Sequence, residues 1–118
     1  MPGVSIHVVD VSRGVVAEGM RVELFAIDDQ ASPRLIASGL LSGTGVLADA
    51  ALDRRFEAGF YEARFHVADF YRSATGVSAT VPFLDVISYR FGIADPQAHY
   101  HLPMKCTPWG YSCFRGGA

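Results

Sequence analysis

Apolar and polar positions alternate along most of this chain with a period of two residues. In segment 4–9, for example, the apolar residues Val4, Ile6 and Val8 alternate with Ser5 and His7. Because successive side chains of a β-strand point to opposite faces, this period predicts strands that bury one face. The pattern predicts strands over residues 4–9, 20–27, 34–37, 60–67, 83–92, 99–106 and 111–115.

One segment departs from this alternation. Residues 68–75 have the spacing of two helical turns and are followed by Gly76, a residue type that commonly ends helices. Many short strands separated by turns rich in Gly, Pro, Asp and Ser are typical of a β-sandwich. We therefore predict an all-β fold: one domain, residues 1–118, built as a two-sheet β-sandwich with one short helix.

The composition limits the classes of partner. The chain has 118 residues, of which 50% are hydrophobic and 19% charged, enough apolar material for one core. The formal net charge is −2 and no basic run is present, which argues against nucleic acid or an anionic membrane as partner. No apolar run has the length of a membrane span, and no signal peptide is visible. With two cysteines, too few for a disulfide framework, these features predict a cytoplasmic protein.

The last twenty residues carry most of the unusual chemistry. Segment 99–118 contains two of the four histidines, both cysteines, the only tryptophan and the only lysine. Along strand 99–106, His99, His101 and Lys105 share one face, and the opposite face is apolar and expected to be core. On strand 4–9, His7 likewise lies opposite the apolar face. We predict that His7, His101 and Lys105 point out of the sandwich and form a catalytic group.

Two imidazoles on one surface suit proton transfer, since imidazole changes charge near physiological pH. One can take a proton from water while the other holds the substrate or the developing oxyanion. A metal site formed by His7, His99 and His101 is a weaker alternative, because a third firm ligand is not evident. We therefore predict neither a metal nor a cofactor. Cys106 and Cys113 are expected to be buried core thiols.

Several segments together resemble the transthyretin-like family, and within it the 5-hydroxyisourate hydrolases. The His-Tyr-His-hydrophobic-Pro signature and the aromatic-Arg-Gly tail are the most specific of them. The matching segments are Ile6-His-Val-Val-Asp with Arg13-Gly, Gly19-Met-Arg-Val-Glu-Leu, Phe56-Glu-Ala-Gly-Phe-Tyr-Glu, Pro82-Phe-Leu-Asp-Val, His99-Tyr-His-Leu-Pro, and Pro108-Trp-Gly-Tyr-Ser followed by Phe114-Arg-Gly.

The resemblance implies a homotetramer, a dimer of dimers, with active sites in the channel between the dimers. His7 matches the family's first-strand histidine, His101 the second histidine of the signature, and Arg115 and Gly116 the tail. It also implies an enzyme whose small heterocyclic substrate is a cyclic amide or ureide. The ring would be opened by a histidine-activated water, as in the hydrolysis of 5-hydroxyisourate in purine breakdown.

The chain departs from the family pattern at several site positions. The family's Asp-Gly-Arg turn falls on Thr44-Gly-Val46, so Val46 stands where the family has arginine. The tail's tyrosine and serine are replaced by Phe114 and Gly117, and Lys105 stands at a position that is usually leucine. We predict that Lys105 supplies part of the lost charge. The predicted substrate-binding residues are Val46, Ser112, Phe114, Arg115, Gly116 and Gly117.

These departures keep two alternatives open. The apolar Val46 and Phe114 favour a bulkier or less polar substrate, as expected of a divergent enzyme in a specialised biosynthetic pathway that opens, closes or rearranges another heterocycle. A non-catalytic small-molecule carrier, as transthyretin is, forms the other alternative. The retention of His7 and His101 argues against a carrier.

Overall fold

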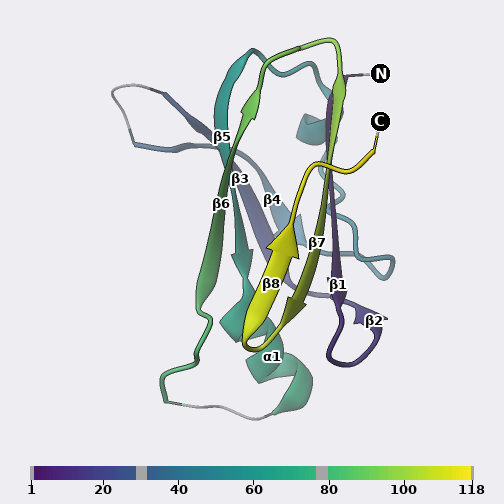
Figure 1. Cartoon of the computed structure of the whole chain (residues 1–118), viewed down its shortest axis with the longest axis vertical. Coiled ribbons are helices and arrows are strands. Elements are labelled where there is room, and N and C mark those ends of the chain that lie inside the picture. Colours follow the sequence, from purple (N-terminus) through teal and green to yellow (C-terminus); the bar gives the residue numbers. More distant parts are fainter. Residues whose placement is uncertain (1, 29–31, 77–79, 118) are drawn as a thin grey trace.

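The computed structural model describes residues 2–28, 32–76 and 80–117. Its strands are β1 (Gly3–Asp10), β2 (Val15–Val16), β3 (Arg21–Ile27), β4 (Arg34–Leu40), β5 (Gly59–His66), β6 (Val86–Ile93), β7 (His99–Thr107) and β8 (Gly110–Cys113), with a 3-10 helix η1 (Ala50–Asp53) and an α-helix α1 (Val67–Thr75). Sheet A has the strand order β2-β1-β7-β8, and sheet B has the order β4-β3-β5-β6 (Figure 1).

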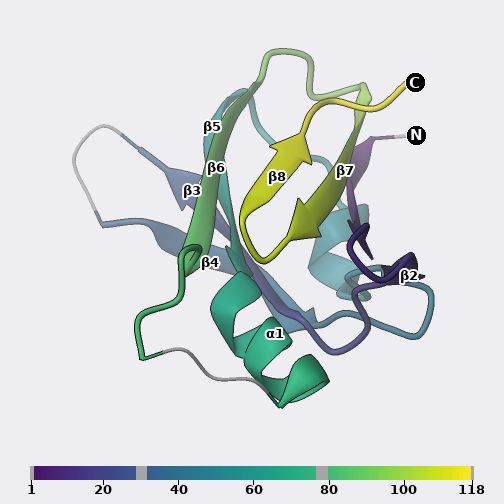
Figure 2. The same ribbon diagram turned by 60° about the horizontal axis from the view of Figure 1, so that its bottom comes forward.

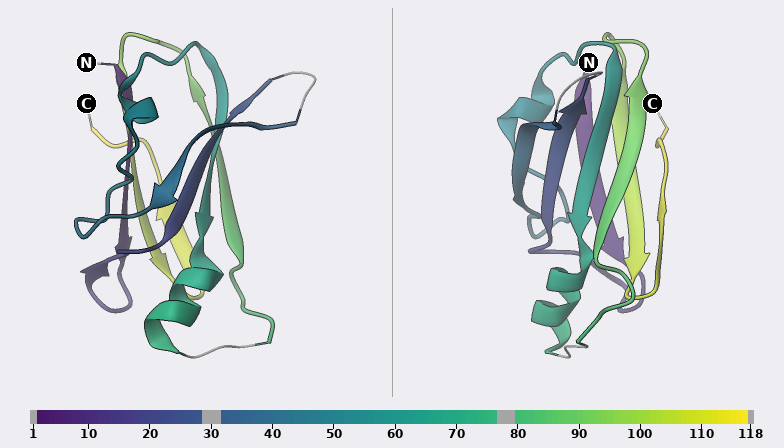
Figure 3. Two further views of the ribbon diagram at one scale, coloured as in Figure 1. Left: turned by 180° about the vertical axis from the view of Figure 1, so that it is seen from behind. Right: turned by 90° about the vertical axis from the view of Figure 1, so that its left-hand side faces the viewer.

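The two sheets pack face to face, as the edge-on view in Figure 3 shows. The alternation in the sequence places one side of every long strand in the core, where each large apolar side chain contributes about 1.5–3 kcal/mol. The buried residues include Ile6 and Val8 of β1, Leu102 and Met104 of β7, Val22 and Leu24 of β3, and Ala63 and Phe65 of β5. The predicted inner faces of β1 and β7 are therefore confirmed.

Helix α1 lies across one end of the sandwich, between β5 and β6 in the chain (Figure 2). It ends at Gly76, whose φ of 69° lies in the left-handed region and whose N–H donates to the carbonyl of Arg72 at 3.1 Å. Phe70 and Tyr71 are buried against the core, and the Tyr71 hydroxyl donates to Asp10 Oδ1 at 2.7 Å. This bond ties the helix to the end of β1.

Several predicted boundaries are wrong by a few residues. Strand β4 continues to Leu40, well past the predicted end at residue 37. Strand β6 begins at Val86, three residues after the predicted start. The Asp85 carbonyl just before it accepts a hydrogen bond from the Ala68 amide of α1 at 3.1 Å, so the chain here bonds to the helix. The last strand ends at Cys113, so Phe114 and Arg115 lie beyond it. The short elements β2 and η1 were not predicted.

The topology places the two histidine-bearing strands side by side. Strands β1 and β7 are parallel neighbours in the middle of sheet A, and their register aligns Ser5 with His101 and His7 with Pro103. Parallel neighbouring strands need a long connection, which residues 11–98 supply between β1 and β7. Within the described part of the chain, no helix has the length and apolar character of a membrane span.

Candidate active site

The outer face of sheet A brings together side chains from β1 and β7. In β1 the burial alternates so that Ser5 and His7 lie half-buried on the outer face. In β7 the same outer face carries His99, which is exposed, and His101, which is half-buried. Because the two strands are in parallel register, these side chains lie on the same side of the sheet, with Ser5 level with His101. The predicted common face of His7 and His101 is therefore present in the structure.

Ser5 connects two of the imidazoles. Its Oγ lies 2.8 Å from Nε2 of His99 and 2.6 Å from Nδ1 of His101, both within hydrogen-bond distance. The hydroxyl has one proton to donate and can accept a second bond, so it can serve both rings at once. Ser5 was not among the predicted site residues, although its place on the same strand face as His7 was a usable signal.

The loop before η1 covers His7. Residues His7 and Val46 form an antiparallel bridge, and the Val8 amide donates to the Gly45 carbonyl at 2.9 Å. Gly45 has a φ of +78°, and a Cβ there would lie 2.9 Å from the Val8 oxygen and 3.2 Å from His7 Nε2. Only glycine fits this position without displacing the loop or the imidazole. Val46 consequently lies directly beside His7.

The C-terminal tail reaches His101 through Gly116. The Gly116 amide donates to the His101 carbonyl oxygen at 2.7 Å, and a Cβ on Gly116 would lie only 2.7 Å from His101 Cδ2. The backbone of the tail therefore packs directly on the imidazole. The predicted role of Gly116 in substrate binding stays a prediction.

Arg115 points elsewhere. Its guanidinium carbon lies 4.0 Å from the ring centroid of Tyr100, and its Nη2 donates to the His99 carbonyl at 3.4 Å. Tyr100 belongs to the buried face of β7, opposite the face that carries His101. In this single chain the guanidinium is thus directed at an aromatic ring, a favourable cation–π arrangement, and its predicted role in substrate binding is not tested.

The remaining predicted residues lie farther from the histidines. Lys105 is exposed and pairs with Ser112 of β8, which shares its face. Lys105 lies four positions after His101 on an extended strand, a distance of about 13 Å. Phe114 is 44% exposed, and Gly117 has open space where a side chain would be. Within one chain the structure does not bring the Lys105 ammonium to the imidazoles, and its catalytic role stays a prediction.

Both cysteines face away from the histidines, as predicted. Cys106 is buried and lies 3.5 Å from the Tyr71 hydroxyl, and Cys113 pairs with Met104 on the inner face. Burial raises the pKa of the Cys106 thiol, and it raises the pKa of Cys113 to about 11. Across residues 2–28, 32–76 and 80–117, no three His, Cys, Asp or Glu side chains converge in a way that could hold a metal ion.

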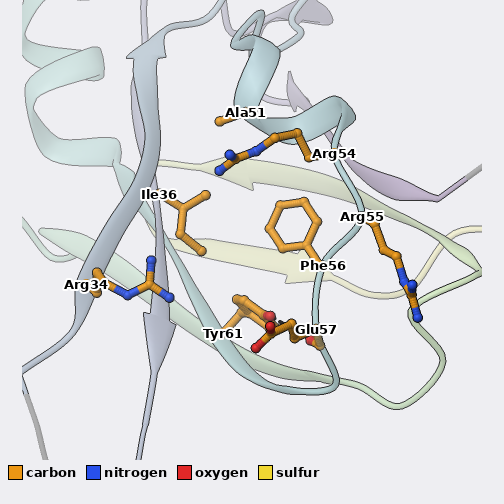
Figure 4. A pocket seen from close by; sticks show the side chains of 8 residues that line it. All are labelled: Arg34, Ile36, Ala51, Arg54, Arg55, Phe56, Glu57 and Tyr61. Carbon is orange, nitrogen blue, oxygen red and sulfur yellow. Dashed lines mark hydrogen bonds between the residues drawn. The ribbon is translucent and has the colours of Figure 1, made fainter.

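A cavity of about 180 Å³ opens elsewhere, between β4, η1 and β5 (Figure 4). Phe56 and Tyr61 form its aromatic wall, with their ring centroids 5.4 Å apart. Its other lining residues are Arg34, Ile36, Ala51, Arg54, Arg55 and Glu57. None of the predicted site residues lines this cavity. The histidines instead lie on the outer face of sheet A.

Two four-stranded sheets of this topology define a transthyretin-like β-sandwich, here with histidines on the outer face of one sheet. The comparisons agree, and the chain belongs to the HIUase/Transthyretin family, whose model matches residues 4–116. A 5-hydroxyisourate hydrolase of Deinococcus radiodurans is 40% identical over 118 residues, which cover 98% of this chain and 96% of that protein. One from Halalkalibacterium halodurans is 38% identical over 96% of both chains.

Solved structures show the same architecture. The 5-hydroxyisourate hydrolase of Klebsiella pneumoniae superposes with a TM-score of 0.78 at 27% identity and covers 99% of this chain and 100% of that one. The structure of (S)-allantoin synthase superposes with a TM-score of 0.86 at 32% identity, over 98% of this chain but 43% of that longer one. The predicted fold class and family resemblance are both confirmed.

Proposed function

We propose that this chain is a hydrolase that opens a cyclic amide or ureide ring, with 5-hydroxyisourate as its substrate. Relatives that carry the name 5-hydroxyisourate hydrolase match it over nearly the full length of both chains, in agreement with the predicted enzyme class. The structural observation that supports the reaction is the common outer face of His7 and His101 on adjacent parallel strands.

The geometry suggests different roles for the two histidines. His101 is held at Nδ1 by Ser5, which leaves Nε2 as the nitrogen that can take a proton from water. The resulting hydroxide attacks a ring carbonyl, and the carbon–nitrogen bond then breaks as the ring nitrogen takes the proton back. General base catalysis of this kind contributes about 10²- to 10⁴-fold in rate. His7, beside Val46, is placed to contact the substrate or the developing oxyanion.

The substrate site is proposed to be completed in a homotetramer, a dimer of dimers. In one chain the outer face of sheet A is only partly covered, and exposed aromatic residues lie on β8 and directly before and after it: Trp109 is 71% exposed, Tyr111 48% and Phe114 44%. Light scattering on a size-exclusion column is expected to give the mass of four chains. A monomer at micromolar concentration would contradict the assembly. The cytoplasmic location stays a prediction from the sequence.

A different heterocycle is the second candidate substrate, and Val46 is the observation that favours it. A valine beside His7 places an apolar surface where the family has an arginine, so less charge is available to polarise a carbonyl. If the purified chain does not accelerate the decay of 5-hydroxyisourate, this second candidate replaces the first.

The experiment follows the ultraviolet absorbance of freshly generated 5-hydroxyisourate with and without the protein. His101→Asn and His7→Asn are each expected to reduce kcat/KM by about 100-fold or more. The matched control is His66→Asn on the outer face of sheet B, where His66 Nε2 lies 2.6 Å from Glu23 Oε1, and this variant should retain its rate. Unchanged rates in both site variants would show that the two histidines are not the catalytic pair.

A further inference from the structure

We propose that Ser5 is a positioning residue that joins His99 and His101 into one hydrogen-bonded chain and thereby decides which nitrogen of His101 is free to accept a proton. The proposal rests on the proposed function for its catalytic consequence, but its structural part can be tested without any substrate. The observation that carries it is the pair of short contacts from Ser5 Oγ, 2.8 Å to His99 Nε2 and 2.6 Å to His101 Nδ1.

The backbone around Ser5 is held firmly. Its neighbours Val4 and Ile6 are 2% and 0% exposed and lie in the core, so the Cα–Cβ bond of Ser5 points out of sheet A. Strand β1 pairs with β7 along its whole length, and the register sets Ser5 opposite His101. On the other edge of β1, the Leu47 amide donates to the Ile6 carbonyl at 3.2 Å. A serine side chain has one torsion that moves its oxygen, so little freedom is lost when Oγ bridges the two rings.

The single hydroxyl proton of Ser5 couples the tautomers of the two imidazoles. A serine hydroxyl carries one proton, and each neutral imidazole carries one proton on one of its two nitrogens. When Oγ–H donates to His99 Nε2, Oγ can accept from His101 Nδ1–H. His101 Nε2 is then unprotonated and can act as a base. When Oγ–H donates to His101 Nδ1 instead, His99 donates from Nε2–H, and His101 carries its proton on Nε2.

The first arrangement is the one that general base catalysis needs. His101 Nε2 takes the proton of water and the ring becomes an imidazolium, whose Nδ1–H still donates to Ser5. The Nε2 proton then passes to the departing ring nitrogen, and His101 returns to its starting state with no net gain or loss of protons. Ser5 holds the ring in one orientation through both transfers, and the outer ring, His99, is exposed to solvent.

This role predicts a change in tautomer that a merely structural hydroxyl would not produce. Nitrogen-15 NMR of the unliganded protein reports which nitrogen of His101 carries the proton. We expect the Nδ1–H form in the unmodified chain and a mixture with the Nε2–H form in Ser5→Ala. Ser5→Thr keeps a hydroxyl at the same position and should preserve the original tautomer. The matched control, Ser88→Ala, removes an exposed hydroxyl from β6 of the other sheet and should change nothing.

A second variant keeps the proposal testable if Ser5→Ala does not fold. His99→Ala removes the acceptor of the Ser5 proton at an exposed position, so Oγ–H should turn to His101 Nδ1 and the Nε2–H tautomer should predominate. An unchanged His101 tautomer in both Ser5→Ala and His99→Ala would overturn the proposal.

The catalytic consequence of the Ser5 bridge is tested by measuring kcat and KM with 5-hydroxyisourate as the substrate. Ser5→Ala is expected to lower kcat by about tenfold or more while KM stays within about twofold, and Ser5→Thr should restore most of the rate. Equal kcat values in the unmodified chain and in Ser5→Ala would overturn the positioning role. If the unmodified chain has no activity on this substrate, the proposed function fails, and the NMR result still decides whether Ser5 sets the tautomer.

Discussion

The backbone of Gly116 lies directly on the imidazole of His101. The amide of Gly116 donates to the carbonyl oxygen of His101 at 2.7 Å, and its Cα approaches so closely that a Cβ would lie 2.7 Å from Cδ2 of the ring. The C-terminal tail is thus attached to strand β7 at the residue proposed to be the general base. The position of the His101 ring therefore depends on its contact with Gly116, and the sequence pattern alone does not reveal this contact.

Replacement of Gly116 by alanine should damage the proposed site more than the fold. The added methyl group must displace either the tail or the His101 ring, so we expect kcat to fall by about tenfold or more with little change in the melting temperature. The matched control is Gly110→Ala, because a Cβ at Gly110 meets nothing within 4 Å. Full activity of Gly116→Ala would show that the imidazole does not depend on this contact.

Val46→Arg should restore a cation beside His7. The bridge between residues 7 and 46 places the new guanidinium near the proposed substrate, where one added donor to a developing oxyanion can contribute about 10²- to 10³-fold. We expect kcat/KM for 5-hydroxyisourate to rise by about tenfold or more. Val15→Arg adds the same charge at an exposed position of β2 and should leave the rate unchanged. A lower rate in Val46→Arg would favour a different substrate.

The hypothesis for Lys105 has an equally direct test. If its ammonium supplies part of the missing charge, Lys105→Met should lower kcat/KM, whereas Lys105→Arg, which keeps the charge, should retain most of it. Arg21→Met removes an exposed cation from β3 of the other sheet and serves as the control. Since Lys105 and His101 lie about 13 Å apart along β7, full turnover by Lys105→Met would leave Lys105 as a solvated surface residue.

The Tyr71 hydroxyl should stabilise the fold through Asp10. Asp10 is fully buried, and although burial alone raises the pKa of this carboxyl, hydrogen bonds from Ser12, Arg13 and Tyr71 outweigh that effect and lower it. Tyr71→Phe removes one of these bonds and is expected to lower the free energy of unfolding by about 1–3 kcal/mol at pH 7. Chemical denaturation measures the difference, with Tyr89→Phe on β6 as the control.

The hydrogen bonds to Asp10 also make the stability of the fold depend on pH. Because the pKa of Asp10 is lower in the folded chain than in the unfolded one, its contribution to stability is complete above the ordinary aspartate pKa of about 3.9. The contribution is lost as the pH falls through the lowered value. The difference between Tyr71→Phe and the unmodified chain should therefore shrink below about pH 4. A difference that is constant from pH 7 to pH 2 would contradict this account.

Cys113 should resist alkylation in the folded protein. With its pKa raised to about 11 by burial, roughly one thiol in 10³ is ionised at pH 8, and the thiolate is the reactive form. Iodoacetamide is expected to label neither Cys106 nor Cys113 at an appreciable rate until denaturant is added. Rapid labelling of the folded chain at pH 8, measured by mass spectrometry, would contradict the burial of these thiols.

The sequence predicted which face of a strand is buried, but it did not predict which strands pair with one another. In β7, the alternation of Tyr100, Leu102 and Met104 with histidines identified the core face, because burial of one face imposes a period of two. The pattern carries no information about which strands pair, so the adjacency of β1 and β7 needed the structure. The apolar residues that suggested a strand start at residue 83 also could not show that the Asp85 carbonyl bonds to the Ala68 amide of α1.

The same limit applies to the site. The common face of His7 and His101 could be predicted, but the bridge through Ser5 depends on the register between two strands that are far apart in the sequence. His66 Nε2 lies 2.6 Å from Glu23 Oε1 on the neighbouring strand β3, a contact that likewise depends on strand pairing. Glu62 is only 6% exposed because the guanidinium groups of Arg64 and Arg90 contact it.

The parallel pairing of β1 with β7 makes the interior and the proposed site inseparable. The alignment that sets Ile6 opposite Leu102 in the core is also the alignment that sets Ser5 opposite His101 outside it. A shift of one residue between these strands would exchange both sets of side chains together. Substitutions deep in the hydrophobic interior can therefore alter proton transfer on the far side of the sheet, and directed evolution of new activity should find useful changes there as well as among the exposed residues.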